Sequence, residues 1–211
     1  TDLYQNLFHE DMRVRLFSQF QLVKRGAEGK AQLEAAVKQQ EHELARLHGI
    51  WGLGQLARQV SKVCEAILPY LEDNNSHVRA QSVKVIGEAL DSKYFPEILK
   101  MTQDKDQRVA FFALTAAGKL GAESAVDTLI EVARNNSDKD VFLRHSVVAG
   151  LIHSKAKDAI NKYSTDSSAA VRRVALLALG RLQDLRVVEF LADDDITIVQ
   201  DTIRVIDTMN E

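Results

Sequence analysis

An apolar pattern that recurs along the whole chain is the feature that most constrains its fold. It is clearest in 170–182, where apolar residues stand at the i, i+3, i+4, i+7, i+8 and i+11 positions of one helix face. We call the first of these residues, Val171, the anchor of its unit. Equivalent anchors, 27–34 residues apart, are Val14, Ala45, Val78, Val109, Leu143 and Ile198. A period of this length is typical of stacked helix-turn-helix units.

Three positions of the unit have a clear physical meaning. The residue eight places after the anchor is always apolar: Leu22, Leu53, Ile86, Ala117, Leu151, Leu179 and Ile206. Three places before the anchor stand Asp11, His42, Asn75, Asp106, Asp140, Ser168 and Asp195, of which six are good N-cap types. Each unit's first helix is therefore predicted to begin just after that position. Nine places after the anchor, four units carry glycine: Gly54, Gly87, Gly118 and Gly180. Glycine destabilises a helix by about 1 kcal/mol relative to alanine, so its recurrence indicates a packing requirement. We therefore predict that neighbouring backbones approach closely at these positions.

The second helices of the units are predicted between these first helices, at roughly 30–40, 59–72, 93–103, 122–134, 154–163 and 184–192. Pro96 fits the first turn of its helix, and Pro69 is expected to end or kink its own. Residues 2–9 resemble the last helix of an earlier repeat, and the final first-type helix is predicted at 196–209. We therefore expect an all-α protein, an α-solenoid of about seven helical hairpins that forms one domain over residues 1–211. We also expect this domain to be a fragment of a longer protein.

Net charge, cysteine content and the lengths of the apolar runs argue against several classes of protein and site. The formal net charge of −3 argues against a general nucleic-acid binder, whose affinity depends on neutralising phosphates. The single cysteine, Cys64, excludes an internal disulfide and a multi-cysteine metal site, and its apolar surroundings indicate a core residue. Since no run of 18 apolar residues occurs, we expect no direct membrane insertion.

The repeated phrases NSHVRAQSVKVIGEAL, DQRVAFFALTAAGKLG and SAAVRRVALLALGRL resemble the HEAT-like repeat of the phycobilisome-lyase type. A narrower resemblance lies in EDMRVRLFSQFQLVKRG and LARLHGIWGLGQLAR, which look like the HEAT segment of large exported bacterial proteins. Those proteins join a membrane-bound dehydrogenase propeller to HEAT repeats and a c-type haem domain. The resemblance implies an exported or periplasmic context. It implies no activity of this chain, which contains neither the propeller nor a Cys-x-x-Cys-His motif.

Arginine follows the anchor in five units, at Arg15, Arg46, Arg79, Arg144 and Arg172. These residues could form a basic surface for an anionic ligand. The favoured interpretation is structural: a ladder of arginines that pair with acidic or capping residues of the adjacent repeat, a task that suits a planar, always-charged guanidinium.

Structural roles are also favoured for the other candidate ligand-binding residues. The six histidines show no helical i, i+4 pair, so neither a metal nor a cofactor site is predicted. Trp51 could stack on a ligand, but it is expected to fill space that its glycine neighbours leave. The run Asp193–Asp195 could bind a cation, but it is expected to be a solvated turn whose last member caps the final helix. Second helices would line a concave face, where Lys100, Arg134 and Lys162 are candidate binding residues.

No catalytic residue is predicted, because the sequence supports neither a serine–histidine–acid arrangement nor a phosphate-binding glycine loop. The leading hypothesis is a non-catalytic scaffold that contacts a protein partner or flanking domains of the same chain. The alternative is an enzyme or chaperone on the same fold, similar to bilin lyases or to HEAT-like DNA glycosylases. A spacer without a partner is a third possibility.

Overall fold

The computed structural model describes residues 2–209, and every element in that range is helical. The chain is an α-solenoid in which long first helices alternate with shorter second elements. The long helices are α2 (Met12–Lys24), α4 (Glu43–Ala57), α5 (Ser76–Glu88), α7 (Gln107–Gly121), α9 (Val141–Ser154), α11 (Ala169–Arg181) and α12 (Ile196–Met209). All seven begin where the capping positions predict, and a short helix, α1 (Leu3–Asn6), precedes them.

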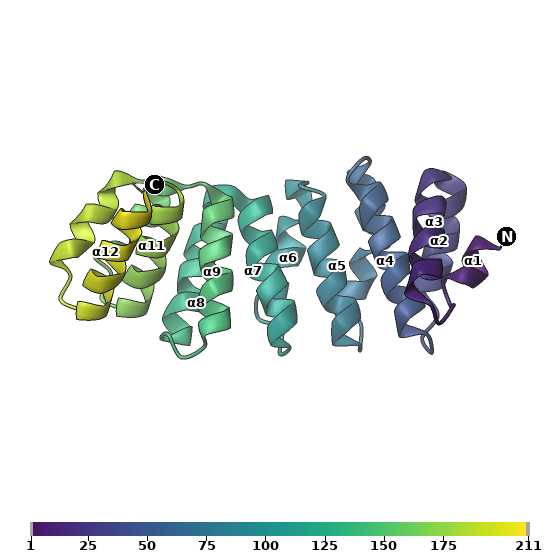
Figure 1. Cartoon of the computed structure of the whole chain (residues 1–211), viewed down its shortest axis with the longest axis horizontal. Coiled ribbons are helices and arrows are strands. Elements are labelled where there is room, and N and C mark those ends of the chain that lie inside the picture. Colours follow the sequence, from purple (N-terminus) through teal and green to yellow (C-terminus); the bar gives the residue numbers. More distant parts are fainter. Residues whose placement is uncertain (1, 210–211) are drawn as a thin grey trace. The chain divides into compact units, whose positions relative to one another are not determined.

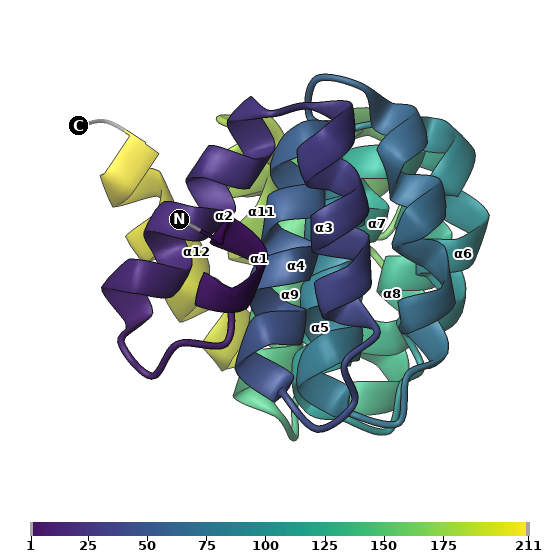
Figure 2. The same cartoon turned by 90° about the vertical axis from the view of Figure 1, so that its right-hand side faces the viewer.

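The chain divides into two compact units, the first comprising Thr1–Ala113 and the second Leu114–Glu211. Within the first unit α2, α4 and α5 lie side by side, and within the second unit α9, α11 and α12 do so (Figure 1). The second element α3 (Ala27–Val37) packs against α4 in both views (Figure 2). Each unit therefore has its own core, formed where first helices meet second elements.

The second elements lie close to their predicted positions, but most of them are divided or partly 3₁₀, and α10 is shorter than predicted. Besides α3 they are η1 (Ser61–Ala66) with η2 (Leu68–Glu72), η3 (Ser92–Tyr94) with α6 (Phe95–Met101), η4 (Ala122–Ala125) with α8 (Val126–Asn136), α10 (Lys157–Asn161) and η5 (Leu185–Ala192). The η elements are 3₁₀ helices. Pro69 stands in the first turn of η2 and separates it from η1, and Pro96 stands in the first turn of α6, as predicted for both prolines.

Side-chain caps hold the start of most first helices. Asp11, Asn75, Asp106, Asp140 and Asp195 each accept a backbone N–H of the first turn through a side-chain oxygen. The prediction that Ser168 caps α11 is wrong, because its side chain makes no capping bond. The carboxylate of Asp166 instead accepts the backbone N–H of Ser168 at 2.8 Å, so the turn before α11 is held by an earlier residue.

Three of the four recurring glycines, Gly54, Gly118 and Gly180, lie at close helix contacts, as their position in the pattern predicts. A Cβ added to Gly54 of α4 would lie 2.6 Å from Val85 of α5. One added to Gly180 of α11 would lie 2.3 Å from Val205 of α12. Both distances are far below ordinary van der Waals contact, so these helices approach only because a side chain is missing.

Several first helices end on a non-glycine residue in the left-handed region. Leu90 follows α5 with φ 55°, and its side chain is 69% exposed, so it contributes little to the core. This backbone conformation is unfavourable for a residue with a Cβ, and glycine is the usual residue here.

We expect Leu90→Gly to raise the free energy of unfolding by about 0.5–1 kcal/mol, because it relieves the left-handed strain at a small entropic cost. Urea denaturation measures the change. Leu44→Gly is the matched control, since Leu44 is also exposed but lies inside α4, where glycine should destabilise. If both variants were equally destabilised, backbone strain at Leu90 would be absent.

One helical run in the described part, 107–136, is long and apolar enough by length and composition to cross a membrane, although 56% of its most apolar window is buried. The run is not continuous, because α7 ends at Gly121 and Ala122 has a φ of 45°. Its two α-helical parts have 15 and 11 residues, below the roughly 20 that a span needs. This feature is therefore weak evidence for a span, and the absence of membrane insertion stays a prediction.

Candidate functional site

Arginines of the predicted ladder make bidentate bridges to aspartates that begin the following repeat. In Arg79, Nε and Nη2 donate to the two carboxylate oxygens of Asp104 at 2.9 and 3.0 Å. In Arg172, the same atoms donate to Asp193 at 2.7 and 2.8 Å. Arg46 also bonds both oxygens of Asp73, but through Nη1 and Nη2, while its Nε donates to the backbone oxygen of Val37 at 2.8 Å. Since these side chains are largely buried, the pairs are shielded from water and salt.

Each bridge also organises the connection on either side of it. Asp104 accepts the backbone N–H of Asp106 at 2.8 Å, and so holds the turn that starts α7. The remaining donor of Arg79, Nη1, bonds the backbone oxygens of Asp73 and Asn74 before its own helix. One guanidinium therefore fixes two successive turns, which is a structural task that leaves none of its three nitrogens for a ligand.

Two arginines of the ladder do not reach the next repeat. Arg15 donates to the backbone oxygens of His9 and Glu10, and has no acidic partner among the described residues. Arg144 pairs with Asp138 of its own connection, which Arg173 also binds at 2.6 Å. For these two residues the expected pairing with the adjacent repeat is therefore incorrect.

The aspartates that pair with these arginines also recur in the sequence, and their position could have predicted the bridges. Five places before the anchor, five of the seven units carry aspartate: Asp73, Asp104, Asp138, Asp166 and Asp193. Asp166 is bound by Arg134 of α8, whose Nη1 and Nη2 donate at 2.7 and 2.9 Å. Arg134, suggested as a binding residue, thus has a bidentate partner, whereas Lys100 and Lys162 are exposed on α6 and directly after α10.

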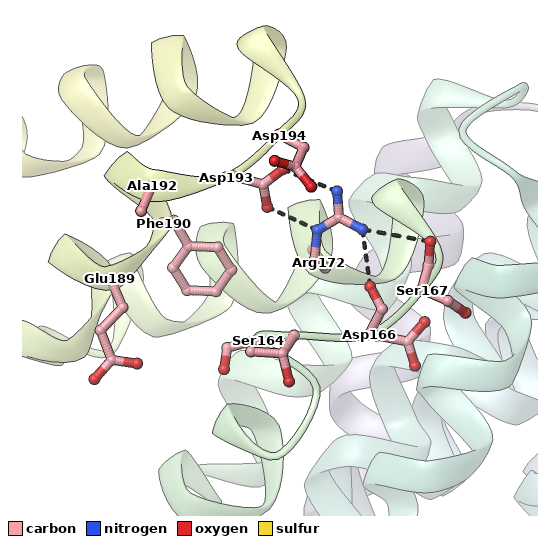
Figure 3. Close-up of a pocket in the computed structure, with 10 residues that line it drawn as sticks. Ser164, Asp166, Ser167, Arg172, Glu189, Phe190, Ala192, Asp193 and Asp194 are labelled. Carbon is pink, nitrogen blue, oxygen red and sulfur yellow. Dashed lines mark hydrogen bonds and ion pairs between the residues drawn. The ribbon is translucent and has the colours of Figure 1, made fainter.

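A hollow of about 510 Å³ surrounds the Arg172 bridge in the second unit (Figure 3). Arg172 donates here to Asp193 and to the backbone oxygens of Asp166 and Ser167, so its guanidinium is satisfied. The bond from Arg172 holds the pKa of Asp193 below its usual range. The remaining charged residues of the rim, Glu189 and Asp194, are acidic and exposed. This hollow is therefore unsuited to an anionic ligand.

A second hollow, of about 280 Å³, lies on the first helices of the first unit. We call it the α2–α4–α5 groove, and it is lined by Leu16, Gln19, Phe20, Trp51, Gln55, Arg58, Lys84, Val85 and Glu88. Leu16 and Phe20 are 37% and 43% exposed, and Phe17 beside them is 55% exposed. Arg58 pairs with Glu88, while Lys84 is exposed. The groove thus combines an apolar edge with a few polar groups, a composition typical of protein-interaction sites.

Polar bonds between successive helices fix the floor of the groove. The indole Nε1 of Trp51 donates to Oε1 of Gln81 at 2.8 Å, and its ring meets the imidazole of His48 edge to face. Nδ1 of His48 lies 2.8 Å from Oε1 of Gln19. This network runs from α2 through α4 to α5 and holds Trp51 half-buried in one orientation, so the indole serves both packing and the groove surface.

Comparisons with known proteins agree with this architecture. Residues 64–151 match the HEAT repeats family, and residues 171–193 match the PBS lyase HEAT-like repeat. These two segments are similar to HEAT-like repeats. No curated protein matches the sequence significantly.

Among solved structures, YibA of Escherichia coli matches with a TM-score of 0.59 at 19% identity, over 99% of this chain and 85% of that one. A HEAT-like repeats protein from Thermococcus onnurineus matches with a TM-score of 0.54 at 12% identity, over 99% and 96%. The complex of CpcE and CpcF of phycocyanin lyase from Nostoc reaches a TM-score of 0.44 at 16% identity, over 98% and 93%. The first two similarities show the fold alone, and the third is too low to bear on function.

The histidine and cysteine side chains have the following surroundings in the structure. Over residues 2–209, no group of three or more His, Cys, Asp or Glu side chains is arranged to hold a metal ion. His77 pairs with Glu43 at 2.9 Å, so this histidine has a structural role. Cys64 is fully buried, and burial raises its thiol pKa to about 11, which makes it an inert core residue.

The buried histidine of the groove floor gives the protein a defined pH dependence. Burial, and then the positive charge of Arg15, lowers the pKa of His48 to about 4, against about 6.5 in the unfolded chain. Between these values the unfolded chain binds a proton that the folded chain does not. Stability therefore falls as pH falls from about 6.5 to 4, by up to about 1.4 kcal/mol per pH unit.

We expect His48→Gln to remove this part of the pH dependence, since glutamine keeps a donor for Gln19 and does not titrate. Urea denaturation at pH 7 and pH 5 compares the two proteins. An equal loss of stability in wild type and variant would show that His48 is not the group responsible.

Proposed function

We propose that this HEAT-like chain is a non-catalytic scaffold that binds a protein partner in the α2–α4–α5 groove. The observation that carries the proposal is the partly exposed apolar edge of Leu16 and Phe20, which lies beside the rigidly held Trp51. Aromatic residues supply a large share of the energy at protein interfaces, especially where the free protein already holds them in place.

One polar group of the groove also favours an occupant. Oε1 of Gln55 is buried and has no hydrogen-bond partner among the described residues. A buried acceptor without a donor costs free energy, and the partly exposed Gln55 side chain would relieve that cost by turning this oxygen toward an N–H or O–H of a partner. Lys84, exposed across the groove, would favour an acidic residue in the same partner.

Comparative affinity capture tests the proposal. The full chain is immobilised as wild type, as Leu16→Ser/Phe20→Ser, and as the control Val141→Ser/Phe142→Ser. The control removes two residues of α9 that are 51% and 77% exposed. We expect a specific partner to be retained by wild type and control and lost by the groove variant. Equal retention by all three proteins would show that the groove is not the site.

A nucleic-acid ligand is the alternative that the groove residues allow, because they include an aromatic ring and two cations. Glu88 neutralises Arg58, however, which leaves Lys84 as the one groove cation without an ion pair among the described residues. Nucleic-acid affinity needs several phosphate contacts. We therefore expect no retardation of DNA or RNA in a gel shift at low salt.

We further propose that the scaffold serves a larger exported protein with dehydrogenase and c-type haem domains. The support is the resemblance of the first sixty residues to the HEAT segment of such proteins. The domain order of the complete gene tests this: a propeller before the repeats and a Cys-x-x-Cys-His motif after them would agree, and unrelated flanking domains would not.

A further inference from the structure

Arg15, the first arginine of the ladder, is buried without an anionic partner. It is 6% exposed, and its Nη1 donates to the backbone oxygens of His9 and Glu10 at 2.6 and 2.7 Å. Its Nε is buried and has no hydrogen-bond partner among the described residues. A guanidinium stays charged in proteins, and a buried charge without a counter-ion is costly. One strong donor of the ladder is therefore left unsatisfied.

The position of the Arg15 guanidinium is the one that binds a carboxylate elsewhere in the ladder. In Arg79 and Arg172, Nη1 likewise donates to the backbone oxygens that stand five and four places before the anchor. Their Nε and Nη2 then reach the aspartate of the following repeat at 2.7–3.0 Å. His9 and Glu10 also stand five and four places before their anchor. Since Nη1 of Arg15 makes the same two contacts, its remaining donors should face the equivalent position.

The repeat that follows Arg15 has no acidic residue at that position. Five places before the anchor Ala45 stands Gln40, where the repeats that follow the three bridged arginines carry aspartate. The side chains of those aspartates are 5–10% exposed. Gln40 is exposed instead, as is the whole connection 38–42. The glutamine therefore does not occupy the buried place that the aspartates take.

Neighbouring carboxylates do not replace the missing aspartate. Asp11 bonds the guanidinium of Arg13 through both carboxylate oxygens and caps the first turn of α2. Glu10 and Glu41 are exposed. Within residues 2–209, Arg15 receives only the two backbone oxygens before its own helix. The acceptor that completes the bridge must therefore come from elsewhere.

We propose that Arg15 is a binding site for a carboxylate that this chain does not itself supply. The carboxylate takes the place of the bridging aspartate and accepts Nε and Nη2 with its two oxygens, the bidentate geometry that a guanidinium favours. It enters over the exposed connection 38–42. Its source is either an aspartate or glutamate side chain of a partner protein or a small free carboxylic acid. The site is separate from the α2–α4–α5 groove, which Arg15 does not line.

The Nε–H signals of the arginines in ¹⁵N NMR spectra of the full chain test the proposal. Sodium acetate is titrated at pH 6, with sodium chloride replacing it at constant ionic strength. We expect the Arg15 signal, identified by its loss in Arg15→Lys, to shift with acetate until it saturates. The signals of Arg79 and Arg172 are internal controls. They should not shift, because each Nε already donates to a carboxylate.

Substitution of Gln40 tests the position of the carboxylate. Gln40→Asp returns a carboxylate to the place that the other repeats fill, so the Arg15 signal should shift without acetate and then no longer respond to it. Gln40→Asn, which has the same length without the charge, should respond as wild type does. Since Gln40 is exposed, both variants should keep the fold. A Gln40→Asp protein whose Arg15 signal matches that of wild type would contradict the proposed position.

A second ligand distinguishes the two sources. Aspartate with blocked backbone ends presents the carboxylate as a protein side chain does. A shift of the Arg15 signal with both blocked aspartate and acetate would support a side chain of a partner protein, and a shift with acetate alone would support a small free acid.

Four results would overturn the proposal. Acetate could leave the Arg15 signal unmoved, or chloride could shift it as far as acetate does. The signals of Arg79 and Arg172 could shift together with that of Arg15, which would indicate a nonspecific effect of the salt. Glu41→Gln could shift the Arg15 signal in the absence of acetate, in which case this chain supplies the carboxylate itself.

Discussion

Arg79→Ala should lower the free energy of unfolding by about 3–5 kcal/mol, the cost of breaking a buried ion pair by removing one partner. Arg79 is only 6% exposed, and it bonds both oxygens of Asp104 and the backbone oxygens of Asp73 and Asn74. Removing the guanidinium leaves the Asp104 carboxylate buried without its cation and frees two carbonyls. Thermal melting and urea denaturation of the full chain measure the loss.

A double-mutant cycle with Asp104→Ala separates the bridge from general damage. If the bridge is the cause, the double variant should be less destabilised than the sum of the single variants, because Asp104→Ala removes the stranded charge. Arg108→Ala is the control, since Arg108 is exposed on the first turn of the next first helix. A melting temperature for Arg79→Ala within error of wild type would contradict the structural role of the arginine.

The second large effect is expected at a glycine. Gly118→Ala should destabilise the protein by about 3 kcal/mol, at the upper end of the usual cost of overpacking, although alanine is the better helix former by about 1 kcal/mol. A Cβ at Gly118 of α7 would lie 1.9 Å from the backbone oxygen of Gly150 in α9. Since the obstacle is backbone rather than the tip of a flexible side chain, the two helices would have to separate and open the core between them.

Ala192→Ser, which adds one atom at an exposed position of η5, is the matched control and should change stability by less than about 0.5 kcal/mol. Denaturation of the two variants and wild type gives the comparison. A stabilised Gly118→Ala protein would mean that the close approach of α7 and α9 does not exist in solution.

The fold was largely predictable because capping and core positions repeat with the same chemistry. Asp11, Asn75 and Asp140 predict where their helices begin, because a carboxylate or amide oxygen at this position can accept a backbone N–H of the first turn. The second elements were less predictable. Val187 and Phe190 are three residues apart, a spacing that both α and 3₁₀ helices accept, so the sequence pattern does not distinguish them.

The site was less predictable than the fold for a related reason. An alignment of the repeats identifies residues that the units have in common, whereas the groove is lined by residues that differ from unit to unit. Six places after the anchor stand Phe20, Trp51 and Lys84, three unlike residues that the stacking of α2, α4 and α5 brings to one hollow. Arg144 shows the same limit, because aspartate stands five places before the anchor both in its own unit and in the next, and only the structure shows that it pairs with Asp138.

Binding of a protein in the α2–α4–α5 groove is tested most directly by site-specific crosslinking. A photoreactive amino acid replaces Phe20 in one protein and Phe142 in another, both at exposed positions. After irradiation in the native cell extract, mass spectrometry identifies the attached proteins. We predict one specific protein crosslinked through position 20, absent from position 142 and lost when Leu16→Ser is added. The same set of proteins at both positions, or none at position 20, would contradict the claim.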